Sequence, residues 1–315
     1  MIIDIFCHYI SPEVSKMIEN GIYGKQYKYP AQNADPEVRL GLMDKYGVDI
    51  QALSQTTPVL MGFNPDEAAE LCRISNDDNY RLCKAYQERF VNICMISLLD
   101  MKSALEELQR SVDELDCRGI TVSSNQNGKG LDSPEYFPFY EKLVEYDLPL
   151  LIHPAHWESY PLIDMEQGWR MMHIFGWPFD STQALWRLIM GGVIDRFPAL
   201  KIVSHHMGAM FPYFVNRIES TFNRHLKDML PRHISEYWNN IYGDTAVDGT
   251  VSAYPCGYAF FGPDRLLYGS DYPFGVEEGE AYIRDNLAGV KAMNLPTDET
   301  EKILGGNARK LLKIR

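Results

Sequence analysis

The stretch "STQALWRLIMGGVIDRFPALKIVSHH", residues 181 to 206, joins a helical pattern to a strand pattern. Over 181–198 the apolar residues recur at spacings of three and four, which is typical of a helix that packs one face against a core. The run "LKIVSHH" at 200–206 follows at once, and its composition predicts a strand. A helix that leads directly into a strand is the repeating unit of a parallel sheet.

The same alternation continues in both directions along the chain. Further strand patterns lie at 1–8, 48–54, 91–97, 119–124, 148–154, 240–245 and 265–271, and further helical patterns lie at 35–47, 65–90 and 101–116. Several helices begin at an Asp or Ser that can cap the helix. Eight strands that alternate with helices favour a closed parallel barrel over an open sheet. We therefore expect an α/β fold, a (β/α)8 TIM barrel, with residues 1–315 in a single domain.

Composition narrows the choice of partners. The chain has 30 Lys and Arg against 43 Asp and Glu, and the net charge of −13 would repel a nucleic-acid backbone. No segment reaches the roughly 18 uninterrupted apolar residues of a membrane span, and the N-terminal run carries Asp4 and no basic residues. The six cysteines show no CxxC spacing and are expected to be reduced thiols. We expect a cytoplasmic protein with neither a nucleic-acid nor a membrane partner.

Polar side chains gather at the predicted strand ends. His8, His153, one of the pair His205 and His206, and Asp271 end the first, fifth, sixth and eighth strands. In a parallel barrel these ends meet at one mouth, where barrel enzymes carry their active sites. Neutral imidazoles and a carboxylate suit Zn²⁺ or Mn²⁺, and a further His can move a proton near neutral pH. The pattern predicts a metal-assisted lyase or hydrolase site.

An aromatic segment follows the fifth strand. Residues 155–180 contain Trp157, Tyr160, Trp169, Phe175 and Trp177. Loops at this end of a barrel form the wall of the active-site pocket, and we interpret this segment as such a wall. The alternative is a surface cover over the neighbouring helices.

The most specific block of sequence is residues 181–218, followed by "YGSDYPFG" at 268–275. With the first strand, "LIHP" at 151–154 and residues 35–54, these segments resemble the amidohydrolase-2 family of barrel enzymes nearly end to end. Within that family the chain is most similar to the aminocarboxymuconate-semialdehyde decarboxylases and more distantly to the γ-resorcylate decarboxylases. The resemblance implies a barrel that binds a divalent metal and removes CO₂ from an acid.

The resemblance also implies roles for single residues. His8, His153 and Asp271 match metal ligands, and Asp271 can also take part in catalysis. His206 matches the catalytic His, because its spacing to Pro212 agrees with the family's pattern, and His205 is then an additional neighbour. Arg217 matches an Arg that reaches the substrate carboxylate in the adjacent subunit, which implies a homodimer. The expected substrate-binding set is Phe6, His156, Trp169, His173 and Arg217.

Two features depart from the family pattern. The first metal ligand, usually His or Glu, is Phe6, whose phenyl ring cannot coordinate a metal. The segment 21–34 is shorter than its family counterpart and offers Lys25 and Lys28 in place of a second carboxylate-binding Arg. Because Lys presents a point charge and no bidentate fork, it would grip the same substrate differently.

Three interpretations of Phe6 remain open. The metal, Zn²⁺ by expectation with Mn²⁺ as the alternative, is held by His8, His153 and Asp271 with water in the free position. Alternatively, His156 or His205 supplies the missing ligand. In the third interpretation the metal is weakly bound or lost, and His206 and Asp271 act alone. Phe6 is expected to make the pocket floor apolar, which favours a planar ring.

The expected activity is metal-assisted, non-oxidative decarboxylation of a small planar unsaturated or aromatic carboxylic acid. The same residues would also serve a metal-dependent hydrolase or hydratase that acts on a lactone, an amide or an unsaturated acid. A third hypothesis is a barrel without catalysis that binds a ligand or partner.

Overall fold

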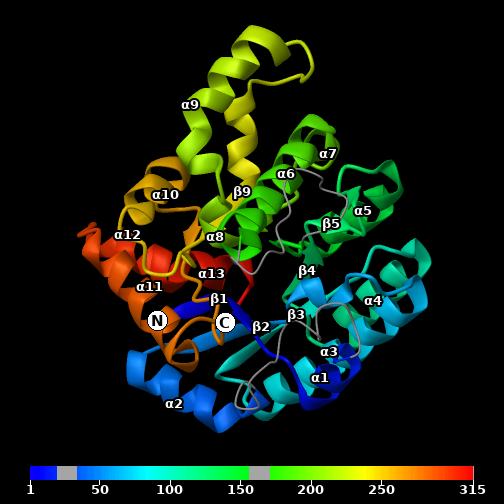
Figure 1. The fold of residues 1–315 in the computed structure, drawn as a ribbon, viewed down its shortest axis with the longest axis vertical. Helices are drawn as coiled ribbons and strands as arrows, with labels where there is room; N and C mark the ends of the chain where they lie inside the picture. The colour runs from blue at the N-terminus through cyan, green and yellow to red at the C-terminus, as the bar shows by residue number, and fades with distance from the viewer. Residues whose placement is uncertain (20–33, 156–170, 315) are drawn as a thin grey trace.

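Eight parallel strands form the centre of the molecule in a computed structural model that describes residues 1–19, 34–155 and 171–314 (Figure 1). In sheet order they are β1 (Ile3–His8), β2 (Ile50–Ser54), β3 (Phe90–Met95), β4 (Gly119–Ser123), β7 (Leu150–His153), β8 (Ile202–Ser204), β9 (Ile241–Asp244) and β10 (Leu266–Leu267). A short hairpin, β5 (Asn125–Gln126) with β6 (Lys129–Gly130), lies outside this sheet. The predicted (β/α)8 barrel is confirmed.

The barrel closes where its first and last strands meet. The Ile5 N–H donates to the Tyr268 carbonyl at 2.9 Å, and the Asp271 N–H donates to the Phe6 carbonyl at 2.9 Å. The His8 N–H donates to the Tyr272 carbonyl at 2.7 Å. We call this junction of residues 4–8 with 268–272 the closing seam. It brings His8 and Asp271, which are 263 positions apart in the sequence, to one end of the barrel.

The helices surround the strands (Figure 1). They are α1 (Pro12–Ile18), α2 (Pro36–Tyr46), α3 (Pro65–Ala85), α4 (Met101–Glu114), α5 (Phe137–Tyr146), α6 (Trp177–Met190), α7 (Val193–Arg196), α8 (His205–Gly208), α9 (Phe211–Thr221), α10 (Ala253–Phe261), α11 (Glu280–Ala292), α12 (Thr297–Glu301) and α13 (Asn307–Leu311). Asp35 and Asp100 cap α2 and α4 as expected of their residue type. In the described part of the chain, no helix is both long and apolar enough to cross a membrane.

Some predicted boundaries were wrong. The helix expected to start at residue 181 begins at Trp177 and continues a π-helical turn, Met172–Gly176, so part of the predicted aromatic loop is helical. The strand expected over 265–271 ends at Leu267, and Asp271 has a φ of 65°. Such a positive φ turns the chain away from the extended strand.

Apolar residues fill the barrel interior. Ile3, Ile5, Phe6, Leu151 and Val203 are completely buried there, in one cluster with residues of α13. A larger cluster lies between the strands and the outer helices. This packing holds the strand ends, and therefore the polar groups they carry, in fixed positions.

The start of α3 offers a local test of stability. The Asn64 side chain accepts hydrogen bonds from the N–H groups of Asp66 and Glu67, while Glu67 accepts from the Asn64 N–H, which completes a capping box. We expect Asn64→Ala to lower the free energy of unfolding by about 1 kcal/mol, because the N–H groups of Asp66 and Glu67 lose their acceptor. Urea denaturation measures the change. An unchanged midpoint would contradict a stabilising role for this cap.

Candidate metal centre

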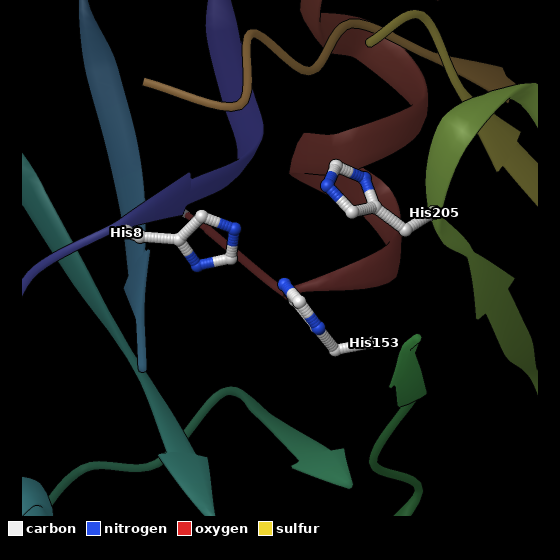
Figure 2. Close-up of side chains that lie close together, drawn as sticks. All are labelled: His8, His153 and His205. Atoms are coloured by element: carbon white, nitrogen blue, oxygen red, sulfur yellow. The ribbon is translucent and has the colours of Figure 1, made fainter. Parts of the chain in front are cut away.

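Three imidazoles and one carboxylate meet at the C-terminal end of the barrel. His8 ends β1, His153 ends β7 and His205 directly follows β8. Figure 2 shows the three rings directed toward a common space, and their ligand nitrogens lie within 4.8 Å of one another. Asp271 completes the group, since its Oδ1 lies 3.2 Å from Nε2 of both His8 and His205. The structure thus brings together the predicted ligands His8, His153 and Asp271, and with them His205, which the sequence offered as an alternative ligand.

Each imidazole is held by an oxygen at its Nδ1 atom. For His8, His153 and His205 the partners are Ser54 Oγ at 3.2 Å, the Pro154 carbonyl at 2.8 Å and Asp244 Oδ2 at 2.5 Å. Ser54 already donates its hydroxyl proton to the Cys7 carbonyl, so it accepts from the Nδ1–H of His8. Metal-binding imidazoles in proteins are oriented by such contacts, which leave Nε2 free for the ion.

The donor set fits a divalent cation. His8 Nε2 is buried and, although Asp271 Oδ1 lies 3.2 Å away, it makes no hydrogen bond among the described residues. Such an atom carries a desolvation cost of about 1–3 kcal/mol unless something binds it. Separations of 3.2 Å between neighbouring donor atoms match those around a tetrahedral ion with bonds of about 2.1 Å. His8, His153, His205 and Asp271 could therefore hold a metal.

Burial and charge set the protonation of these groups. Burial lowers the pKa of His8 and lowers that of His153 well below its usual value, so both rings are neutral, as ligands must be. Burial also acts to lower the pKa of His205, but the carboxylates of Asp244 and Asp271 raise it to about 10. His205 and its neighbours in turn overcome the effect of burial on Asp271 and hold its pKa well below the usual range. A cation, either a proton or a metal, is thus favoured at His205.

Phe6 does not form the pocket floor. Its ring is completely buried and stacks on the His205 ring, with centroids 3.8 Å apart and an interplanar angle of 6°. Among the described residues it is not part of the cavity wall, so the substrate-binding role expected for Phe6 does not follow from its position. Instead, Phe6 packs behind His205 and supports that ring.

His206 faces the cavity while His205 lies beneath it. The His206 ring stacks on His205 at 3.8 Å, its side chain is 19% exposed, and its Nε2 lies 3.8 Å from Asp271 Oδ2. Residues 206–209 all have positive φ values, which reverses the side-chain alternation of the preceding strand. Two consecutive histidines therefore lie in two layers of one site, with His205 among the donor groups and His206 in the cavity wall.

A cavity of about 700 Å³ lies above these groups, a size that suits a small ligand. Its wall includes His173, Trp177, His206, Asp248, Asp271 and Tyr282. The predicted residues His173 and Trp177 thus lie in the wall, whereas Arg217 is exposed on α9 and lines a separate groove with residues of α6. The predictions for His156, Trp157, Tyr160, Trp169, Lys25 and Lys28 lie outside the described residues.

Sequence reasoning missed two functional candidates. Asp244 ends β9 and holds His205, and the strand-end rule that selected His8 and His153 would also have selected it. Asp248 follows in the next loop and lines the cavity. No strand pattern marks its position, so it could not have been found in that way.

A parallel eight-stranded barrel with imidazoles and a carboxylate at its C-terminal mouth defines the class of metal-dependent barrel enzymes. Comparison with protein families gives a more specific result, because the amidohydrolase family model matches residues 3–314. The chain belongs to this family.

Individual relatives agree with this assignment. The chain is 31% identical to a 2-amino-3-carboxymuconate-6-semialdehyde decarboxylase of Dictyostelium discoideum, with 98% of this chain and 84% of the relative covered. It is 27% identical to a γ-resorcylate decarboxylase of a Rhizobium species, with 98% and 96% covered. Among solved structures, the 5-carboxyvanillate decarboxylase of Novosphingobium aromaticivorans, complexed with manganese and 4-hydroxy-3-methoxy-5-nitrobenzoic acid, superposes with a TM-score of 0.87 at 26% identity, with 100% and 96% covered.

Proposed function

We propose that this protein is a metal-assisted, non-oxidative decarboxylase of a small planar aromatic or unsaturated carboxylic acid. The observation that carries the proposal is the two-layered site, in which His8, His153 and His205 lie beneath a cavity whose wall contains Asp271 and the imidazole of His206. The decarboxylase activity named for relatives over nearly the whole chain supports this reaction.

The proposed metal ligands are His8, His153 and Asp271, with His205 in place of the ligand that Phe6 cannot provide. The stacking of Phe6 on His205 supports this exchange, because the phenyl ring fixes the imidazole that does the coordinating. Imidazole nitrogens and a carboxylate accept both Zn²⁺ and Mn²⁺, and we propose Zn²⁺ with Mn²⁺ as the alternative. When bound, the ion supplies positive charge that attracts the substrate carboxylate and an adjacent oxygen.

His206 is the proposed general acid. From the cavity wall it delivers a proton to the ring or alkene carbon that bears the carboxylate. The bond between this carbon and the carboxylate then breaks, its electron pair returns to the conjugated system, and CO₂ leaves. Asp271 lies near the His206 Nε2 atom and orients the imidazole for this transfer.

A homodimer is also part of the proposal. Arg217 is exposed, lies outside the wall of its own cavity, and has no ion-pair or hydrogen-bond partner in the described part of the chain. This placement suits an Arg that reaches the substrate carboxylate in a neighbouring subunit. The six free cysteines support the expected cytoplasmic location.

Release of CO₂ is the direct test of the proposed reaction. The purified protein is incubated with hydroxylated benzoic acids and unsaturated dicarboxylic acids while headspace CO₂ is measured, before and after chelation and after return of Zn²⁺ or Mn²⁺. We expect CO₂ release that chelation abolishes and a metal restores. Consumption of an acid or lactone without CO₂ would instead establish a hydrolase or hydratase. No turnover of any compound would favour a binding barrel.

Metal content tests the ligand set separately. We expect about one metal ion per chain by plasma mass spectrometry, loss of that ion in His8→Ala, and at least tenfold weaker metal binding in His205→Ala. The matched control is His225→Ala, because His225 is exposed on the segment after α9 and should leave the metal in place. Wild-type metal affinity in His205→Ala would show that His205 is not a ligand. The coordination set would then be the other three protein ligands and a water molecule.

A further inference from the structure

Asp248 occupies a constrained position in the cavity wall. It lies in the loop after β9, its side chain is open to the cavity, and its backbone φ is 52°. Residues other than Gly rarely adopt this left-handed conformation, although Asp and Asn tolerate it best. The loop therefore presents this carboxylate to the cavity.

A buried asparagine fixes the loop on both sides of Asp248. The Asn286 Oδ1 accepts from the N–H of Val247 at 3.3 Å and from the N–H of Gly249 at 3.2 Å. The Asn286 Nδ2 donates to the carbonyl of Ser270 at 3.1 Å, directly before Asp271. One completely buried side chain thus holds Asp248 at a defined distance from the metal ligand Asp271.

Tyr282 on α11 completes the arrangement. Its side chain lines the cavity with Asp248, and although burial raises the pKa of the Asp248 carboxyl, the nearby Tyr282 hydroxyl acts to lower it. The ring packs directly over Gly275, whose φ is +89° and where a Cβ would lie 2.4 Å from the ring. An ionised carboxylate such as that of Asp248 has about four lone-pair sites and can accept hydrogen bonds from the cavity side.

The described wall of the cavity contains no Lys or Arg. Its carboxylates are Asp248 and Asp271, and only Asp271 lies in the metal centre. An acid that enters this cavity therefore finds positive charge at the metal centre and negative charge at Asp248. A second carboxylate near Asp248 would be repelled, whereas a hydroxyl or amino group there would donate a hydrogen bond to a charged acceptor.

We propose that Asp248, held by the loop that Asn286 fixes, selects acids that carry a hydrogen-bond donor on the ring edge away from the reacting carboxylate and excludes acids with a second carboxylate there. This selectivity rests on the proposed function, because the orientation of the ring assumes that its reacting carboxylate lies at the metal centre.

The test compares ligands that differ only in this group. Salicylates with a hydroxyl meta or para to the carboxylate are titrated beside their methyl ethers and beside the corresponding dicarboxylates, and quenching of tryptophan fluorescence gives each dissociation constant. We expect the hydroxylated acid to bind at least tenfold more tightly than its ether. Asp248→Gly, which suits the positive φ, should remove that preference. Asp248→Asn should increase the affinity for the dicarboxylate.

A control variant and CO₂ release separate the possible outcomes. The control variant is Glu88→Gln, which neutralises an exposed acid outside this cavity wall and should retain the preference for the hydroxyl. The inference is overturned if Asp248→Gly keeps the wild-type preference, or if no probe binds. If binding shows the preference but no probe releases CO₂, the proposed reaction fails while the selectivity stands.

Discussion

We expect asparagine in place of His206 to lower the rate of CO₂ release by about 10²-fold or more and to leave the metal content unchanged. His206 is the imidazole in the cavity wall, whereas His205 is completely covered and cannot reach a substrate. Asparagine cannot act as a general acid near neutral pH, so proton delivery to the substrate carbon is lost. Steady-state CO₂ release, with plasma mass spectrometry on the same samples, measures both effects.

The backbone conformation at His206 suits asparagine, so this substitution should leave the local fold undisturbed. Its φ of 56° and ψ of 58° lie in the left-handed region, which Asn tolerates almost as well as Gly does. The matched control is His225→Asn, an exposed histidine outside the cavity wall. Turnover within a few-fold of wild type in His206→Asn would exclude the assignment of His206 as the proton donor.

Much of the fold could be predicted because local pattern and tertiary packing agree. Strand ends that carry His8 and His153 were placed correctly, since a buried parallel strand leaves a clear apolar run in the sequence. The start of α6 was not, because the π-helical turn before it follows no simple periodicity. Asp271 was selected for the right end of the barrel, although it lies beyond its strand and not within it.

The different positions of His205, among the donor groups, and His206, in the cavity wall, could not be predicted. In an extended strand, consecutive side chains point to opposite faces, so the strand pattern alone does not place both histidines at the mouth, although His205 was expected as an alternative ligand. The positive φ values from His206 onward bring both rings to the same side. The buried acceptor Asp244, which raises the pKa of His205, comes from a strand nearly 40 residues further along the chain. Only the three-dimensional structure shows that pairing.

The closing seam gives the largest expected change in stability, through Arg39. Methionine at this position should lower the free energy of unfolding by about 3 kcal/mol or more, because it leaves two buried acceptors without a donor. Arg39 on α2 is 1% exposed and donates to the His8 carbonyl and, at 2.9 Å, to Gln51 Oε1. Gln51 donates in turn to Asp4 Oδ2 at 3.0 Å, and the Ser270 N–H donates to Asp4 Oδ1 at 2.9 Å. Urea denaturation measures the loss.

The pH dependence of stability distinguishes loss of the Arg39 charge from loss of packing. Burial raises the pKa of Asp4 from 3.8 to about 6, while the Arg39 charge acts to lower it. A raised carboxyl pKa contributes stability that is complete below the unfolded pKa and is lost as pH rises through the folded pKa, so the contribution of Asp4 to wild-type stability should fall between about pH 4 and 6. Without the Arg39 charge that fall extends above pH 6. Arg73→Met, at an exposed arginine on α3, is the control and should change stability by no more than about 0.5 kcal/mol. Equal unfolding free energies in the two variants would show that the closing seam does not depend on Arg39.

Metal binding by Arg39→Met tests a further consequence of the closing seam. Weaker metal binding in this variant than in wild type would show that the network that closes the barrel also positions His8 and Asp271.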